Sequence, residues 1–241
     1  MTRKVTSVIC FILFWQICAL YINKPIIFPY PTEVFVKMVA YLGDKSFYQA
    51  VLSTLGRTAL SFLIAFIIGL TLGLMSGLNS KLKDYISPII SILQTIPQIA
   101  FVLVILFWFN SLQSLIITVC LMLVPSFYYN IVAGLENIDQ ELKDVITLYH
   151  HPLYYTIPHI YLPLIKGYIL SAIDNCLPLS LKVGVMAEIF VSAKAGIGKK
   201  LYYARTSIDM AGILALTIWM VILIFVINGL YHLIIKKSVQ Q

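Results

Sequence analysis

The segment from Ile86 to Leu135 runs for fifty residues without a charged side chain. As one α-helix it would be about 75 Å long at roughly 1.5 Å per residue, whereas the hydrocarbon core of a bilayer is only about 30 Å thick. The segment must therefore turn back on itself, and the polar residues 110–113 mark the turn. We predict two membrane spans, over residues 86–109 and 112–134.

The whole composition agrees with a membrane protein. The chain is 60% apolar and 11% charged with a mean hydropathy of +0.92, whereas soluble domains are about 45–50% apolar and about 25% charged. A water-soluble fold could not bury that much apolar surface. We expect one all-α integral membrane domain over residues 1–241, with about six transmembrane helices and a lipid membrane as its surroundings.

The first span is expected at residues 5–22, after the basic residues Arg3 and Lys4. No small-x-small cleavage site follows it, so we interpret it as a retained span rather than a signal peptide. The core of the domain is expected over residues 46–235. It begins with a span from near Phe47 to Leu78, in which three glycines at every fourth position, Gly69, Gly73 and Gly77, would let another helix approach closely.

The fifth span, at residues 164–190, contains Asp174, Pro178, Lys182 and Glu188. A charge near the centre of a span costs at least about 2.5 kcal/mol, so this helix is not a plain lipid-facing one. Lys182 either reaches the outer surface or pairs with Glu188, or it lines a water-filled pathway and meets an anionic solute. Pairing with Asp174 would need the bend that Pro178 can supply.

Two other prolines lie inside spans, and the last span is free of charge. Pro97 and Pro125 suggest kinks.

Residues 210–235 form the sixth span. Six spans place both termini on one side of the membrane, but the basic residues divide equally between the two sides and do not orient the chain.

The charge and the cysteines exclude some functions. The net charge of +7 comes from basic residues scattered between apolar blocks, so we expect no nucleic-acid binding. The four cysteines, Cys10, Cys18, Cys120 and Cys176, lie in apolar segments without C-x-x-C spacing, and no metal site is expected. Residues 196–200 lack the spacing of a nucleotide-binding P-loop, so we expect no cofactor on this chain.

The longest strongly polar segment, residues 136–163, lies between the fourth and fifth spans. Apolar residues recur there at helical spacing, with polar residues on the opposite face, which predicts an amphipathic helix too short to span. We expect Asn137 to cap its start, and a second short helix to have Pro152 in its first turn and to end at Pro158. The apolar face consists of Ile138, Leu142, Val145, Ile146 and Tyr149.

This segment ends in Ile160-Tyr161-Leu162-Pro163, and it resembles the loop E-A-A-x3-G-x9-I-x-L-P of ATP-binding-cassette importer permeases. In register, the triplet falls on residues 144–146, and His150 stands where the family has glycine. The resemblance implies a type I importer permease fold in which this cytoplasmic loop forms coupling helices against the ATPase subunits. It assigns coupling to Leu142, Asp144, Val145, Ile146, Tyr149, His150, Ile160, Leu162 and Pro163.

An ordered set of further motifs is similar to the nitrate, sulfonate and taurine permeases and covers residues 28–235. The set comprises Phe28-Pro29-Tyr30-Pro31-Thr32, Thr54-Leu55-Gly56-Arg57-Thr58, Gln94-Thr95-Ile96-Pro97, Trp108-Phe109, Ala187-Glu188 and Gly196-Ile197-Gly198. The resemblance implies two ATP-binding subunits that carry ATP and Mg²⁺, a second permease copy or homologue, and an extracytoplasmic solute-binding protein. It also implies the bacterial cell membrane, with both termini and the loop in the cytoplasm and residues 23–46 and 191–209 outside.

The expected solute pathway contains Lys182, Asp174, Glu188 and Pro97. The family suggests a small anion such as a sulfonate, with a pyrimidine-type vitamin precursor as the alternative. Two other classes of function are weighed against an importer permease, which has no catalytic residues. A membrane-embedded enzyme would need a nucleophile and base, metal ligands or paired acids within the spans, and a secondary transporter would be expected to show an inverted repeat.

Overall fold

The computed structural model describes residues 2–149 and 151–239, and the regular elements of this part of the chain are all helices. The chain divides into two compact units. The first unit consists of Met1–Thr54 and Ser192–Gln241, and the second unit consists of Leu55–Val191.

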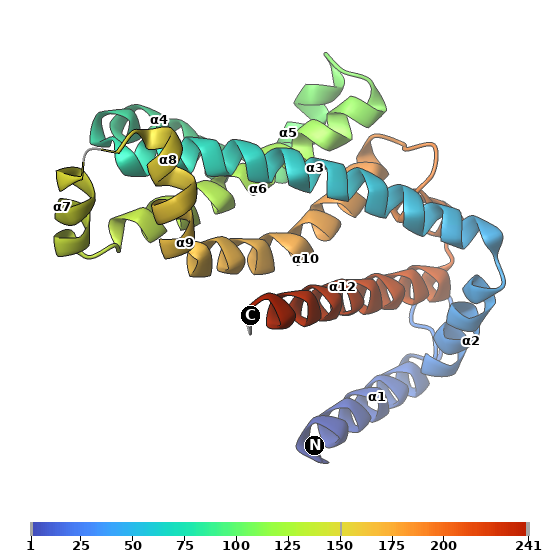
Figure 1. The fold of residues 1–241 in the computed structure, drawn as a ribbon. Coiled ribbons are helices and arrows are strands. Elements are labelled where there is room, and N and C mark those ends of the chain that lie inside the picture. Colours follow the sequence, from blue (N-terminus) through green and yellow to red (C-terminus); the bar gives the residue numbers. More distant parts are fainter. Residues whose placement is uncertain (1, 150, 240–241) are drawn as a thin grey trace. The chain divides into compact units, whose positions relative to one another are not determined.

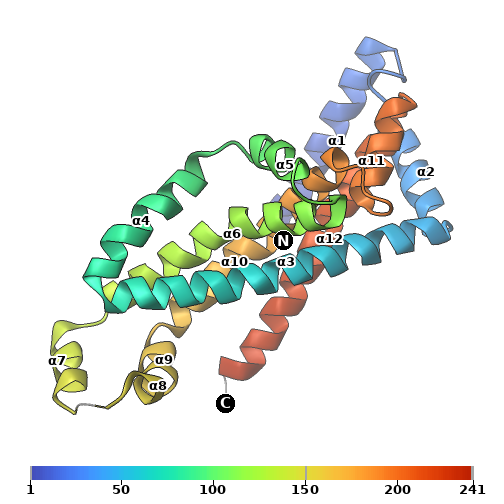
Figure 2. The same cartoon turned by 90° about the horizontal axis from the view of Figure 1, so that it is seen from above.

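The second unit is built around α6 (Ser111–Glu136), against which α4 (Ser80–Thr95), α5 (Gln98–Leu106) and α10 (Lys166–Phe190) pack. The part of α3 (Lys45–Leu78) that belongs to this unit runs alongside α6 (Figures 1 and 2). Since α6 is covered from several sides, it contains the largest fully buried side chains of the unit, among them Tyr128, Phe127 and Leu123.

The three glycines of α3 contact α6 directly. A Cβ atom on Gly69 would lie 2.4 Å from Cβ of Phe127, and one on Gly73 would lie 2.7 Å from Cβ of Ile131. One on Gly77 would lie 2.4 Å from Cδ1 of Leu135. No side chain fits at these distances, so the glycine spacing serves close helix packing, as predicted.

The predicted span over residues 86–109 is broken at Pro97, where the sequence predicts a kink, and its predicted start is corrected. The helix begins earlier, at Ser80, where Oδ1 of Asn79 accepts hydrogen bonds from the next turn, and it breaks between α4 and α5 with a bend of 96° (Figure 2). Pro97 has no N–H to continue the helix, and Ile96 before it is extended at φ −71° and ψ 128°. The turn before the next span is shifted from the predicted residues 110–113 to residues 107–110, and Asn110 caps α6 by accepting from the Gln113 N–H at 3.0 Å.

Four described helices are long and apolar enough to cross a membrane: α3, α6, α10 and α12 (Met210–Val239, whose described apolar part ends at Leu233). The bent pair of α4 and α5 brings the number to five if the two helices together make one broken span. The first predicted span, over residues 5–22, corresponds to α1 (Thr2–Ile22), whose described apolar part, Ile9–Ile22, is shorter than the other spans.

The polar loop of the second unit forms α7 (Gln140–Leu148), α8 (Leu153–Thr156), a π-helical turn over Ile157–Tyr161 and α9 (Leu162–Leu164) (Figure 1). Three expectations about its boundaries are corrected. Asn137 ends α6 rather than starting α7, because its N–H still bonds to the Ala133 carbonyl, and Asp139 takes the N-cap position. Pro152 precedes α8 as its N-cap. Pro158 is the second residue of the π-helical turn instead of ending a helix, since a proline in the first turn costs no internal hydrogen bond.

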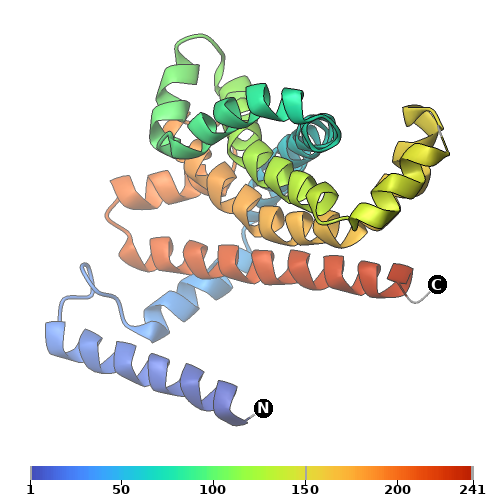
Figure 3. The same ribbon diagram turned by 90° about the vertical axis from the view of Figure 1, so that its left-hand side faces the viewer.

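The first unit contains α1, α2 (Pro31–Leu42), the start of α3, α11 (Ile197–Thr206) and α12. α2 packs against α12, and the indole N–H of Trp219 donates to the Met38 carbonyl at 3.1 Å. The ring of Phe47 lies between those of Tyr41 and Trp219, with centroid distances of 5.6 Å to each. α11 folds back beside α12 (Figure 3).

Candidate solute pathway and coupling loop

Lys182 lies on the exposed face of α10 in the second unit, together with Ser171 and Asn175. These positions are four and seven residues apart, so the three side chains share one face of the helix. None of the four ion pairs formed among the described residues includes Lys182. The helix therefore carries a polar stripe with an ammonium group on a side that this unit leaves uncovered.

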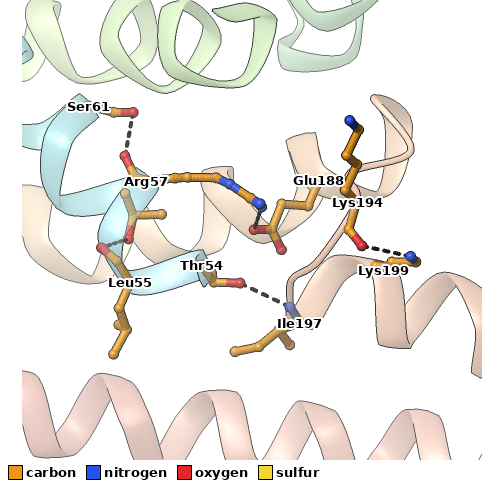
Figure 4. Close-up of polar contacts among 9 residues, drawn as sticks. Thr54, Leu55, Arg57, Ser61, Glu188, Lys194, Ile197 and Lys199 are labelled. Atoms are coloured by element: carbon orange, nitrogen blue, oxygen red, sulfur yellow. Dashed lines mark hydrogen bonds and ion pairs between the residues drawn. The ribbon is translucent and has the colours of Figure 1, made fainter. Parts of the chain in front are cut away.

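Glu188, the other charged residue near this end of α10, is buried and faces α3. Its side chain is 1% exposed, and Oε1 accepts a hydrogen bond from Nη1 of Arg57 at 2.9 Å (Figure 4). One turn earlier on α10, a Cβ atom on Gly184 would lie 2.3 Å from Cγ2 of Thr58. The ion pair and this close backbone approach join α3 to α10. Of the alternatives for Lys182, pairing with Glu188 is therefore wrong, because Glu188 pairs with Arg57.

The break in the α4–α5 span lies beside the polar stripe. Pro97 is exposed, and Nε2 of Gln98, the first residue of α5, donates to the backbone carbonyl of Val183 at 3.4 Å. Val183 follows Lys182 directly. The structure therefore brings Pro97 and Lys182 to the same region of the second unit, while Asp174 lies half-buried about two turns away on α10.

The sequence placed Arg57 in a family motif but gave it no role in the site. The sequence did contain a signal for a role, because Arg57 and Glu188 are charged residues within otherwise apolar helical segments. Such residues usually pair with another charge. What the sequence could not supply was the pairing across 131 residues of chain.

The described chain leaves much of the apolar face of α7 exposed. Leu142 is 37% exposed, Val145 48% and Tyr149 69%, while Ile146 is half-buried. Asp144 lies on the polar side, where Oδ1 accepts from Nε2 of Gln140 at 2.9 Å. A short helix that exposes an apolar face is typical of a surface to which another protein binds.

The end of the loop is anchored in the second unit. Tyr161 and Leu162 pack against the buried cluster of Ile131, Leu135 and Ile165, while Ile160 is half-buried and Pro163 is exposed. This packing explains why Tyr161 and Leu162 are largely apolar. His150, the remaining coupling residue predicted from the sequence, lies outside the described residues.

In the first unit, α11 and its flanking loops are held by polar contacts. The N–H of Ile197 donates to Oγ1 of Thr54 at 2.9 Å (Figure 4), and Gly196 before it has φ 147°, a conformation that favours glycine. Nζ of Lys200 contacts Asp44 at 2.9 Å, and Nζ of Lys37 contacts Asp209 at 2.8 Å. The glycine motif thus marks a tight loop rather than a phosphate site.

These contacts shift the pKa of both acids downward. Hydrogen bonds from Lys200 and from the Ser46 hydroxyl and N–H lower the pKa of Asp44 from 3.8 to about 2. Burial raises the pKa of Asp209, but hydrogen bonds from Lys37 and from the Gly212 N–H outweigh it and lower the pKa. Among the described side chains, no group of three His, Cys, Asp or Glu residues gathers to hold a metal ion.

Comparisons with known proteins agree with this arrangement. The family described as binding-protein-dependent transport system inner membrane component matches residues 65–240. Two similar solved structures are inward-facing conformations of the MetNI methionine ABC transporter, and each comparison covers 79% of this chain and 94% of that chain. The selenomethionine-soaked CY5 crystal form is 21% identical with a TM-score of 0.69, and the native CY5 form is 20% identical with a TM-score of 0.67. No curated protein matches the chain.

The family match covers more than half of the chain, and the structural likeness shows the type I importer fold. Both kinds of relative are membrane subunits of transporters rather than enzymes. The chain therefore belongs to the family of binding-protein-dependent transport system inner membrane components, as a multi-pass permease subunit of an ATP-binding-cassette importer.

Proposed function

We propose that this chain moves a small anionic solute across the bacterial cytoplasmic membrane, driven by ATP and Mg²⁺ bound to two separate ATPase subunits. A second copy of the permease, or a homologue, completes the pathway, and an extracytoplasmic binding protein delivers the solute. The observation that carries the proposal is the apolar face of α7, which the chain leaves exposed at Leu142, Val145 and Tyr149.

The ATPase subunits dock on the loop of residues 136–163, where Asp144, Ile146, His150, Ile160, Leu162 and Pro163 complete the coupling surface. This places the loop and both termini in the cytoplasm, and residues 23–46 and 191–209 outside. The anchoring of Tyr161 and Leu162 in the buried cluster supports the role, because a docked loop must be fixed to the spans that it moves.

The pathway runs along the polar stripe of α10, where Lys182 supplies a positive charge. In a site partly shielded from bulk water, an ammonium attracts an anion more strongly, because the effective dielectric constant is lower. Pro97 forms part of the wall at the helix break. Asp174 and Glu188, also on α10, complete the proposed pathway residues. Glu188 acts through its ion pair with Arg57, which joins α10 to α3.

The resemblance to nitrate, sulfonate and taurine permeases supports a sulfonate-like solute, with a pyrimidine-type vitamin precursor as the second candidate. The structural relatives are described as methionine transporters. Their sequence identity of 20–21% to this chain supports a shared fold and not a shared solute. Purifying the partner binding protein and identifying the compound that it retains separates the three.

The docking proposal is tested with Val145→Asp. The charge should prevent burial of the α7 face, so the ATPase subunits should no longer co-purify or be stimulated. Thr147→Asp is the matched control, because it adds the same charge to the polar side of the same helix. An unchanged complex with normal transport in Val145→Asp would refute docking through α7. External labelling, in intact cells, of a cysteine placed at Lys143 would refute the orientation.

A further inference from the structure

Glu136, the last residue of α6, connects the coupling loop to the broken span. Its backbone carbonyl accepts a hydrogen bond from Nζ of Lys143 in α7 at 3.0 Å. Its carboxylate forms an ion pair with Nζ of Lys83, in the first turn of α4. A single residue at the end of one helix therefore contacts both the helix of the candidate coupling surface and the start of the broken span.

The broken span extends from this contact to the candidate pathway. α4 is held to α6 at Ser91, whose hydroxyl lies 2.6 Å from the Tyr129 hydroxyl. After the 96° bend, Gln98 at the start of α5 bonds to the Val183 carbonyl, next to Lys182. One pair of helices thus touches α7 through Glu136 at one end and α10 beside Lys182 at the other.

We propose that the Lys83–Glu136 ion pair is the contact through which movement of α7 reaches the α4–α5 span, which makes both residues positioning residues for coupling. The inference rests on the proposed function. A helix transmits displacement along its axis because its backbone is stiff, whereas the bend after Thr95 converts that displacement into a movement of the α5 start against α10. The ion pair makes the first turn of α4 the point at which the displacement reaches the α4–α5 span.

The exposure of the pair argues against a purely structural role. The side chains of Lys83 and Glu136 are 38% and 49% exposed, and ion pairs with that much contact with solvent contribute little to folding. Loss of the pair should therefore leave the fold and the assembly intact. An effect on coupling without an effect on assembly would identify the transmission role.

The experiment uses the complex of the permease with its own ATPase subunits in proteoliposomes. The stimulation of ATP hydrolysis is measured on addition of the partner binding protein, used as purified. In Lys83→Met and in Glu136→Gln, stimulation per assembled complex should fall at least about fivefold, a typical lower size for coupling between sites. The charge swap Lys83→Glu with Glu136→Lys should restore stimulation to within about twofold of wild type, since it rebuilds the pair.

Lys37→Met is the matched control. It breaks another exposed lysine–carboxylate pair, with Asp209 in the first unit, and should leave stimulation unchanged. Full stimulation in Lys83→Met, or a charge swap no better than the single variants, would overturn the inference while leaving the importer function in place. Absence of both co-purification and stimulation in the wild-type complex would refute the proposed function and this inference with it.

Discussion

The Arg57 guanidinium on α3 contacts the Glu188 carboxylate on α10 at 2.9 Å, with the carboxylate side chain 1% exposed. Removing one partner of a buried ion pair leaves an uncompensated buried charge, which costs about 3–5 kcal/mol. The pair therefore makes the contact between these two helices sensitive to any change that removes a single charge.

We expect Arg57→Met to lower the thermal unfolding midpoint of the detergent-purified permease strongly. The double variant Arg57→Met with Glu188→Gln should recover most of the loss, because no buried charge remains unpaired. Lys37→Met, which breaks an exposed pair, should change the stability by about 0–1 kcal/mol. Equal midpoints for Arg57→Met and Lys37→Met would show that the buried pair is not formed.

Gly184→Ala tests the close approach of the same two helices. The added Cβ would lie 2.3 Å from Cγ2 of Thr58, and such overpacking costs roughly 1–3 kcal/mol. Thr58→Ser deletes that methyl group, so the combination of Gly184→Ala with Thr58→Ser should regain the wild-type midpoint. Gly167→Ala, on the same helix with open space around it, is the control and should be neutral. A harmless Gly184→Ala would mean that α3 and α10 lie further apart.

Lys182→Met should reduce solute uptake by roughly tenfold or more if the ammonium binds an anionic solute, because a hydrogen bond to a charged group contributes about 1.5–3 kcal/mol. Uptake is measured with the compound that the binding protein retains, and Lys182→Arg should keep most of it. Expression and stimulation of ATP hydrolysis by the binding protein should persist in both variants. Loss of folding alone in Lys182→Met would assign Lys182 a structural role.

The Lys200–Asp44 contact should depend on pH only in the acid range. Since the pKa of Asp44 is lowered from 3.8 to about 2, its ionised form stabilises the first unit above pH 3.8. This contribution is lost as the pH falls toward about 2. Hydrogen-exchange protection of α11, corrected for intrinsic rates, should fall over that interval. Asp44→Asn should show the reduced protection already at neutral pH, and wild-type protection in this variant would contradict the contact.

Several features of the fold follow from local sequence alone. The fifty uncharged residues from Ile86 could not remain one helix across a bilayer, and Asn110 begins the new helix because its side chain accepts from the Gln113 N–H. Gly69, Gly73 and Gly77 recur at the spacing that puts small residues on one helix face. The apolar period from Leu142 to Tyr149 predicts α7. Each of these depends on residues within a few turns of one another.

Other features were decided by tertiary structure, because they depend on residues far apart in the chain. The sequence predicted a kink at Pro97, but its size of 96° is set by the packing of α4 and α5 against α6 and of α5 against α10. Asn137 had the residue type of an N-cap, yet α6 extends far enough for its N–H to bond to Ala133, so it ends that helix. Glu188 could have paired with Lys182 on its own helix. The fold instead brings Nη1 of Arg57 within 2.9 Å of the Glu188 carboxylate, and a buried carboxylate is stable only when a cation pairs with it.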